Sequence, residues 1–202
     1  VDCTEAILGD NESYRKQLVY GADHWYGNLD VAFGIHQGNQ GLAVGDINGD
    51  GREDLFISQP AGLPCRLLIQ QEDGTLQDQT REYDLEWLDA SRNGMFVDLD
   101  NDGDQDFIIS LNYSTVIFEN LAPGKLFLRT QIDVHSWPAS FAAADYDGDG
   151  DVDLFICGYN PRGETAPGDI FANPVPYHDA NNGARNFMMQ NDGEFAFSDV
   201  TA

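Results

Sequence analysis

Three nine-residue stretches share one acidic pattern, which constrains the fold more than any other feature of the chain. Oxygen-bearing side chains stand at positions 1, 3, 5 and 9 and a glycine stands at position 6 in residues 46–54, 98–106 and 145–153. Five carboxylates within nine residues, as in 145–153, repel one another strongly unless a cation lies among them. Calcium accepts six to eight oxygen ligands in a flexible shell, so the sequence predicts up to three Ca²⁺ sites.

The predicted ligands are the side chains at positions 1, 3, 5 and 9 and the backbone carbonyl at position 7. They are Asp46, Asn48, Asp50, Arg52 and Asp54 in the first loop, Asp98, Asp100, Asp102, Asp104 and Asp106 in the second, and Asp145, Asp147, Asp149, Asp151 and Asp153 in the third. Glycine at position 6 permits a sharp turn that a side chain would hinder. Because Asn48 and Arg52 replace acids of the other loops, we expect the first loop to bind calcium most weakly.

An EF-hand is a poor match for these loops. An EF-hand has a bidentate Glu at position 12, whereas these loops carry Ile57, Ile109 and Ile156 there. Short apolar runs bounded by turn residues flank each loop, and such runs favour strands over helices. They are residues 41–45, 94–97 and 140–144 before the loops, and 55–57, 107–109 and 154–156 after them.

The pattern repeats with a period of about 50 residues. Each strand, loop and strand is followed by a second predicted hairpin, at residues 66–76, 116–126 and 186–195, with an Asp-Gly or Pro-Gly pair at or near its turn. Each period therefore holds four short strands, which is the content of one propeller blade. The predicted fold class is all-β, built of four-stranded antiparallel blades.

Three predicted blades cover about residues 40–92, 93–138 and 139–202. Residues 1–39 lack an intact loop, so they are expected to form a degenerate or partial blade, with strands at 18–20 and 31–33 and a short helix within 5–17. The third blade contains a long Pro-, Gly- and Asn-rich insertion between Cys157 and Asn186.

A D-x-[DN]-x-D-G-x-x-D loop followed by a hairpin such as residues 191–201 resembles the FG-GAP/VCBS repeats of integrin alpha-subunit propellers and many secreted proteins. The resemblance covers residues 41–201. It implies a calcium-stabilised β-propeller of secreted or cell-surface proteins, commonly seven-bladed and used in adhesion or ligand binding. We therefore expect a structural or adhesive scaffold outside the cell, with a protein or carbohydrate ligand at its rim loops.

Only three complete blades are visible, whereas propellers typically close with four to eight. The chain can belong to a longer propeller, residues 1–39 can complete a four-bladed ring, or a second copy can cover the open end. We favour an open arc, completed by further blades or by self-association through the N-terminal segment and the last blade near Phe195 and Phe197.

The net charge and the hydropathy of the chain limit the kinds of partner that we expect. The net charge is −25 with ten Lys and Arg in all, so nucleic acids and anionic membranes are poor partners. No apolar run approaches the roughly 18 residues that span a bilayer, so we expect no transmembrane segment. Calcium loops of low affinity suit the calcium-rich extracellular space, which is the expected location.

The alternative function is the propeller part of a polysaccharide-acting, lyase-like enzyme. Tyr177, His178 and Arg185 are the candidates for a base and a charge neutraliser, but their spacing selects no reaction. No nucleophile elbow, phosphate loop or zinc spacing occurs. We therefore expect no enzymatic activity.

The cysteines and two glycosylation motifs leave alternatives open. Cys3, Cys65 and Cys157 are odd in number, so buried free thiols are the simpler expectation, with a disulfide from Cys3 left open. Asn11 and Asn112 each begin an Asn-x-Ser motif, which is compatible with glycosylation of a secreted protein.

Overall fold

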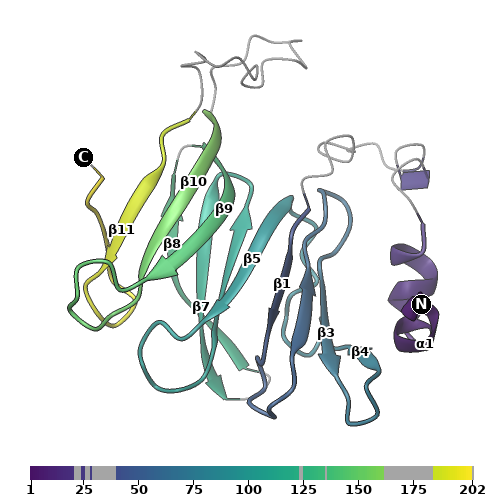
Figure 1. Cartoon of the computed structure of the whole chain (residues 1–202). Helices are drawn as coiled ribbons and strands as arrows, with labels where there is room; N and C mark the ends of the chain where they lie inside the picture. The colour runs from purple at the N-terminus through teal and green to yellow at the C-terminus, as the bar shows by residue number, and fades with distance from the viewer. Residues whose placement is uncertain are drawn as a thin grey trace.

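The computed structural model describes residues 1–20, 24–25, 28, 40–122, 125–134, 136–161 and 184–201, the side chains of 122, 160 and 161 excepted. Apart from two short helices, the regular structure of these residues consists of three four-stranded antiparallel sheets. The all-β prediction is confirmed, and Figure 1 shows the sheets side by side, like the blades of a propeller. The described residues contain no closed ring of blades.

In every sheet the strands lie in the order in which they occur in the sequence. Blade 1 consists of β1 (Leu42–Gly45), β2 (Asp54–Ile57), β3 (Arg66–Gln70) and β4 (Leu76–Asp78). Blade 2 consists of β5 (Ser91–Val97), β6 (Asp106–Leu111), β7 (Ser114–Ala122) and β8 (Lys125–Asp133). Blade 3 consists of β9 (Ser136–Ala144), β10 (Asp153–Pro161), β11 (Phe187–Asn191) and β12 (Phe197–Asp199).

Neighbouring blades pack through two hydrophobic clusters. Between blades 1 and 2, the ring of Phe56 meets that of Phe107 edge to face, with centroids 4.8 Å apart. Between blades 2 and 3, Ile108 packs with Leu154, and both are fully buried. Alternate residues of a strand point to opposite faces of its sheet, so a blade with neighbours on both sides has two apolar faces. The short apolar runs seen in the sequence follow from this arrangement.

The N-terminal segment differs from its prediction in part. It contains the expected short helix, α1 (Thr4–Leu8), but a π-helical turn, η1 (Tyr14–Leu18), stands where the predicted strand begins. The helical spacing turns the buried side chains of Ser13 and Gln17 to one side. Gln17 Nε2 donates to the carbonyl of Pro64 at 2.9 Å, which attaches the segment to blade 1. The second predicted strand, residues 31–33, lies outside the described residues.

Of the two glycosylation motifs, only that of Asn112 begins with an exposed Asn. Asn11 is 9% exposed, donates to the Leu76 carbonyl at 2.6 Å and accepts from the Asp78 N–H at 2.7 Å. A glycan on Asn11 would break these bonds to β4, so this side chain has a structural use.

Two further expectations are corrected by burial. Phe195 is 6% exposed and Phe197 packs beside it in the cluster between blades 2 and 3, so neither forms an open end of the arc. All three cysteines are free thiols, but only Cys65 is buried, and Cys3 is exposed. No helix in the described part of the chain is long and apolar enough to cross a membrane.

Candidate metal sites

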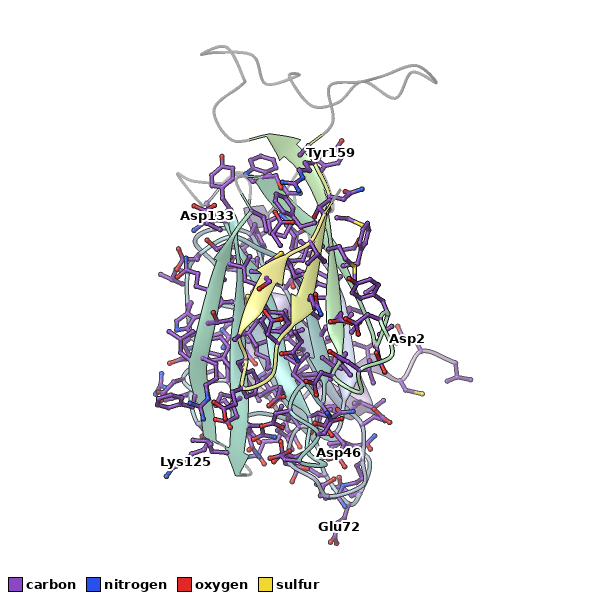
Figure 2. The ribbon with its side chains drawn as sticks, turned by 90° about the vertical axis from the view of Figure 1, so that its left-hand side faces the viewer. Asp2, Asp46, Glu72, Lys125, Asp133 and Tyr159 are labelled. Atoms are coloured by element: carbon purple, nitrogen blue, oxygen red, sulfur yellow. The ribbon has the colours of Figure 1, made fainter. Side chains whose placement is uncertain are left out.

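Each acidic loop joins the first and second strands of its blade, and the loops lie at one end of the sheets, the lower end in Figure 1. We call residues 46–54, 98–106 and 145–153 loops 1, 2 and 3. In Figure 2, Asp46 of loop 1 lies near this end and Tyr159 of β10 lies at the opposite one. The predicted strand, loop and strand unit is confirmed in all three blades.

The aspartate at position 9 is the buried anchor of every loop. Asp54, Asp106 and Asp153 are at most 1% exposed. Each accepts one N–H from position 2 of its own loop and one from the end of the third strand. For Asp106 these donors are Leu99, at 2.8 Å, and Asn120, at 3.0 Å. This carboxylate therefore ties the loop to a strand that is distant in sequence.

Further backbone N–H groups shape each loop around its acidic side chains. The carboxylate at position 1 accepts the N–H of position 6, at 2.7–3.1 Å, in all three loops. The side chains at positions 3 and 5 accept N–H groups two residues further on. Position 6 has a φ of 82° at Gly51, 97° at Gly103 and 100° at Gly150, where glycine avoids the strain of a side chain, as predicted.

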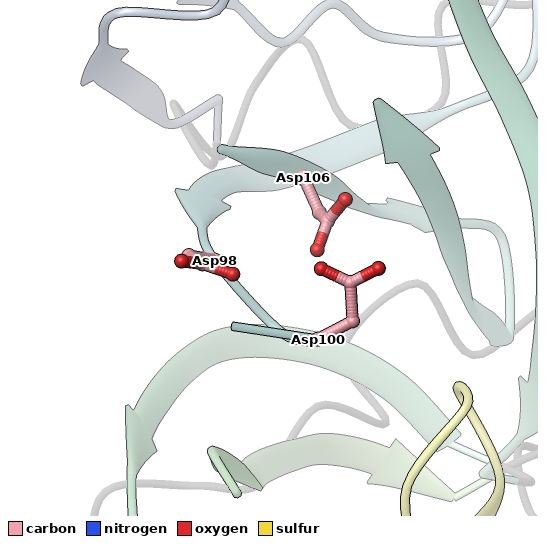
Figure 3. Close-up of side chains that lie close together, drawn as sticks. All are labelled: Asp98, Asp100 and Asp106. Atoms are coloured by element: carbon pink, nitrogen blue, oxygen red, sulfur yellow. The ribbon is translucent and has the colours of Figure 1, made fainter. Parts of the chain in front are cut away.

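Loop 2 brings three carboxylates together at its centre. Asp98, Asp100 and Asp106 offer oxygen atoms that all lie within 4.8 Å of one another. Figure 3 shows the carboxylates of Asp100 and Asp106 turned toward each other, with Asp98 beside them. Oδ1 of Asp98 is buried without a hydrogen-bond partner, as is Oδ1 of Asp104. These oxygens are available to a cation.

The electrostatics of loop 2 point the same way. Burial raises the pKa of Asp106 to about 7, and the carboxylates of Asp100 and Asp104 add to this rise against the two backbone donors. Burial also raises the pKa of Asp104 to about 6, with Asp102 and Asp100 adding to it. Burial and the neighbouring carboxylates thus both disfavour the charged form of these two side chains, and a bound cation would favour it.

Loop 3 also gathers three carboxylates, but in a more open setting. Asp145, Asp147 and Asp149 offer oxygens within 4.8 Å of one another, and all three are exposed. Desolvation, followed by the charges of neighbouring acids, raises the pKa of Asp147. Gln190 Nε2 of β11 donates to Asp147 Oδ2 at 2.7 Å and ties this side chain to the sheet.

Loop 1 balances its charge with its own side chains. The guanidinium of Arg52 forms an ion pair with Asp50 Oδ2, and its Nε donates to the Gln70 carbonyl at 3.1 Å. Asn48 Nδ2 donates to the same Asp50 oxygen at 2.9 Å. Among the described residues, groups of three acidic side chains with oxygens within 4.8 Å occur in loops 2 and 3 and not in loop 1.

The remaining predicted ligands lie in the loops but outside these groups. Asp102 accepts the Asp104 N–H at 3.0 Å, and Asp153 is the buried anchor of loop 3. Asp151, at position 7, accepts Asn101 Nδ2 of loop 2 at 3.2 Å, and this bond links two neighbouring loops.

Sequence reasoning missed the asparagines that link the blades. Asn120 Nδ2 donates to the Ile47 carbonyl of loop 1 at 2.8 Å, and Asn191 Nδ2 donates to the Leu99 carbonyl of loop 2 at 2.9 Å. Both amides are buried and belong to the blade that follows the loop. The available signal was an asparagine after the apolar run of the third strand in two repeats.

Of the three catalytic candidates, only Arg185 lies in the described residues. Its guanidinium pairs with Asp199, at 3.2 Å, and donates to the Thr201 carbonyl at 3.1 Å. Arg185 is thus engaged at the edge of blade 3. Tyr177 and His178 lie outside the described residues.

With the loops and blades in place, the comparison with protein families is decisive. The sequence model of the FG-GAP-like repeat matches residues 46–109 and again residues 98–156, more than half of the chain in all. The chain belongs to the FG-GAP-like repeat family. Each match begins at one acidic loop and ends in the strand that follows the next acidic loop, so the matched region contains all three loops. The chain is therefore a β-propeller-like repeat module, as the sequence resemblance predicted. No curated protein matches the chain.

Proposed function

We propose that loops 2 and 3 of this FG-GAP repeat module bind Ca²⁺, and that the metal stabilises the blades rather than performing chemistry. The observation that carries the proposal is the meeting of three carboxylates in each loop, with Asp98 Oδ1 buried and unpaired in loop 2. A cation within 3 Å of these oxygens would remove their mutual repulsion and satisfy the unpaired oxygen.

The donor chemistry supports calcium over other cations. The candidate ligands are carboxylate and backbone carbonyl oxygens, which hard cations prefer, whereas zinc favours Cys and His. Magnesium demands near-ideal octahedral geometry and keeps several waters, while calcium tolerates a flexible shell of six to eight oxygens. Each loop offers oxygens from positions 1, 3, 5, 7 and 9, more than a hydrated magnesium ion would use.

A bound ion would stabilise a blade through the anchor at position 9. Asp106 joins the candidate group of loop 2 and also accepts the N–H of Asn120 in β7. An ion at this carboxylate would therefore hold the hairpin of β5 and β6 against the third strand. We propose that the resulting rigid arc serves as a structural or ligand-binding scaffold outside the cell, where calcium is plentiful.

We propose a non-catalytic role for the module. Arg185 is held by Asp199 and Thr201, which supports a structural use of this cation. Measurable turnover on a panel of acidic polysaccharides, abolished by His178→Ala, would contradict the proposal.

Thermal unfolding in calcium and in excess chelator tests the role of the metal. A site filled at 100 times its dissociation constant adds about 2.7 kcal/mol to the free energy of unfolding. We expect chelation to lower the melting temperature by several degrees, calcium to restore it and magnesium to restore it poorly. An unchanged melting temperature after exhaustive metal removal would overturn the proposal.

A further inference from the structure

Each pair of neighbouring blades is joined through position 2 of an acidic loop. Ile47 and Leu99 hold this position, and they are 0% and 2% exposed because each lies in the cluster that joins its blade to the next. Their carbonyls accept the hydrogen bonds of Asn120 and Asn191 described above. The loop of one blade is thus held by the third strand of the following blade.

Blade 3 presents the loop side of this contact, as blades 1 and 2 do. The described residues contain no fourth sheet to cover it. We call the face that a blade turns to the following blade its forward face. Tyr146, at position 2 of loop 3, is 52% exposed. Phe155, on the forward face of β10, is 38% exposed, whereas its counterparts Phe56 and Ile108 are both fully buried. Phe155 pairs with Ala142 and Met188 on the neighbouring strands, so the open forward face of blade 3 is apolar.

Blade 1 presents the other half on its backward face, the face opposite to the one that packs on blade 2. The β1 side of this face is open, whereas on its β3 side Arg66, the strand partner of Ile57, donates to Gln17 Oε1 of the N-terminal segment at 2.9 Å. Leu42 and Val44 of β1 lie there, 62% and 61% exposed. Their strand partners on β2 are Ile57 and Leu55, both half-buried, which makes this face apolar too. The residue of blade 2 that corresponds to Val44 is Phe96, which is 9% exposed and packs on blade 1.

Blade 1 also has an amide at the position of the linking asparagines. Gln70 ends β3, and its backbone N–H donates to Asp54, as Asn120 donates to Asp106 and Asn191 to Asp153. The side chain of Gln70 therefore occupies the position from which Asn120 and Asn191 donate to the loop of the preceding blade.

We propose that the forward face of blade 3 docks the backward face of blade 1 in a second copy of this chain. Tyr146 and Phe155 of one copy pack against Val44 and Leu42 of the other, and the amide of Gln70 binds the carbonyl of Tyr146. Both faces are apolar, and they repeat a contact that the chain already uses twice. Such a head-to-tail contact adds copies in one direction, to a ring if the rotation closes and to a filament if it does not. The inference goes beyond the proposed calcium role, since it concerns the sheet faces.

Sedimentation of the full 202-residue chain in calcium tests the docking. About 0.15 M salt gives a Debye length of about 8 Å, which limits repulsion between copies that each carry a charge of −25. We expect the wild-type chain to form oligomers that grow with concentration. Phe155→Asp and Val44→Asp each place a charge in one face and should weaken association at least tenfold. Leu128→Asp is the matched control, because Leu128 is 53% exposed on the outer strand of blade 2, outside both proposed faces. This variant should associate as the wild-type chain does.

Mixing the two variants separates head-to-tail docking from other modes of association. Each variant keeps one intact face, so an equimolar mixture should form dimers and nothing larger. Tyr146→Ser removes the ring without adding charge beside loop 3, so it gives the same test if Phe155→Asp fails to fold. A wild-type chain that is monomeric at all concentrations, variants that associate as wild type, or a mixture that stays monomeric would overturn the docking. Because these variants leave the metal ligands intact, their folded monomers should keep the calcium-dependent shift in melting temperature.

Discussion

Loop 1 and loop 2 have similar backbone hydrogen bonds and differ in how they balance charge. In both, the anchor at position 9 accepts the N–H of position 2 and of the third strand, and position 1 accepts the N–H of the glycine. In loop 1 Arg52 pairs with Asp50, whereas in loop 2 an oxygen of Asp98 and an oxygen of Asp104 are buried without a hydrogen-bond partner. The same loop conformation therefore forms whether or not a side chain of the loop balances the charge of its carboxylates.

The largest expected effect comes from removing the anchor in each of the two loops. Asp106→Ala and Asp54→Ala each leave two N–H groups without an acceptor, all of them buried except the part-buried one of Gln70, at a cost of up to about 2–6 kcal/mol. In saturating calcium only Asp106→Ala also loses a filled site, which adds about 2.7 kcal/mol at 100 times the dissociation constant. Denaturant unfolding should therefore show that Asp106→Ala lowers the free energy of unfolding more than Asp54→Ala does in calcium. In chelator the two variants should differ little. Equal costs in calcium would mean that loop 2 holds no stabilising ion.

A smaller effect is expected from position 5, where the side chain lies at the loop surface. Asp149→Ala removes a carboxylate of the loop 3 group, so in saturating calcium it should lower the free energy of unfolding by about 1–3 kcal/mol. Asp50→Ala removes a partly exposed ion pair with Arg52, which is worth about 0.2–1 kcal/mol. The same unfolding experiment ranks the two variants. A costlier Asp50→Ala would mean that loop 1 is the metal-dependent loop.

The third prediction converts loop 1 to the charge of loop 2. The double variant Asn48→Asp, Arg52→Asp removes both side-chain donors to Asp50 and gives the loop the acids that loop 2 has at positions 3 and 7. Two more carboxylates and one cation fewer should tighten calcium binding at loop 1 by at least about tenfold. In chelator the variant should be less stable than wild type because its repulsion is unbalanced. Titration of the variant and the wild type under one condition checks the gain, and an unchanged affinity would refute the charge argument.

The strands and loops were predictable because their signals are local. Three acidic loops with glycine at position 6, flanked by short apolar runs, predicted the strand pairs and excluded the EF-hand. The helical turn at Tyr14–Leu18 escaped prediction because a three-residue apolar run at 18–20 carries no periodicity, and contacts with blade 1 decide its conformation.

The rest of the site depends on contacts that sequence spacing does not encode. The sequence predicted a use for the backbone carbonyl of Arg52 but not for its long side chain, which reaches the carboxylate of Asp50 in its own loop. The amides of Asn120 and Asn191 reach carbonyls 73 and 92 residues away, across the boundary between blades. The sequence predicted that Phe195 lies at an open end of the arc, but the packing of blade 3 on blade 2 buries its side chain.

Calcium titration calorimetry of the wild-type chain, beside Asp50→Ala, tests the central claim most directly. The account predicts two tight sites, in loops 2 and 3, and a third that is much weaker or undetectable because Arg52 already balances loop 1. Asp50→Ala should leave the two tight sites unchanged. Three equal sites, no site at all, or the loss of a tight site in Asp50→Ala would contradict the account.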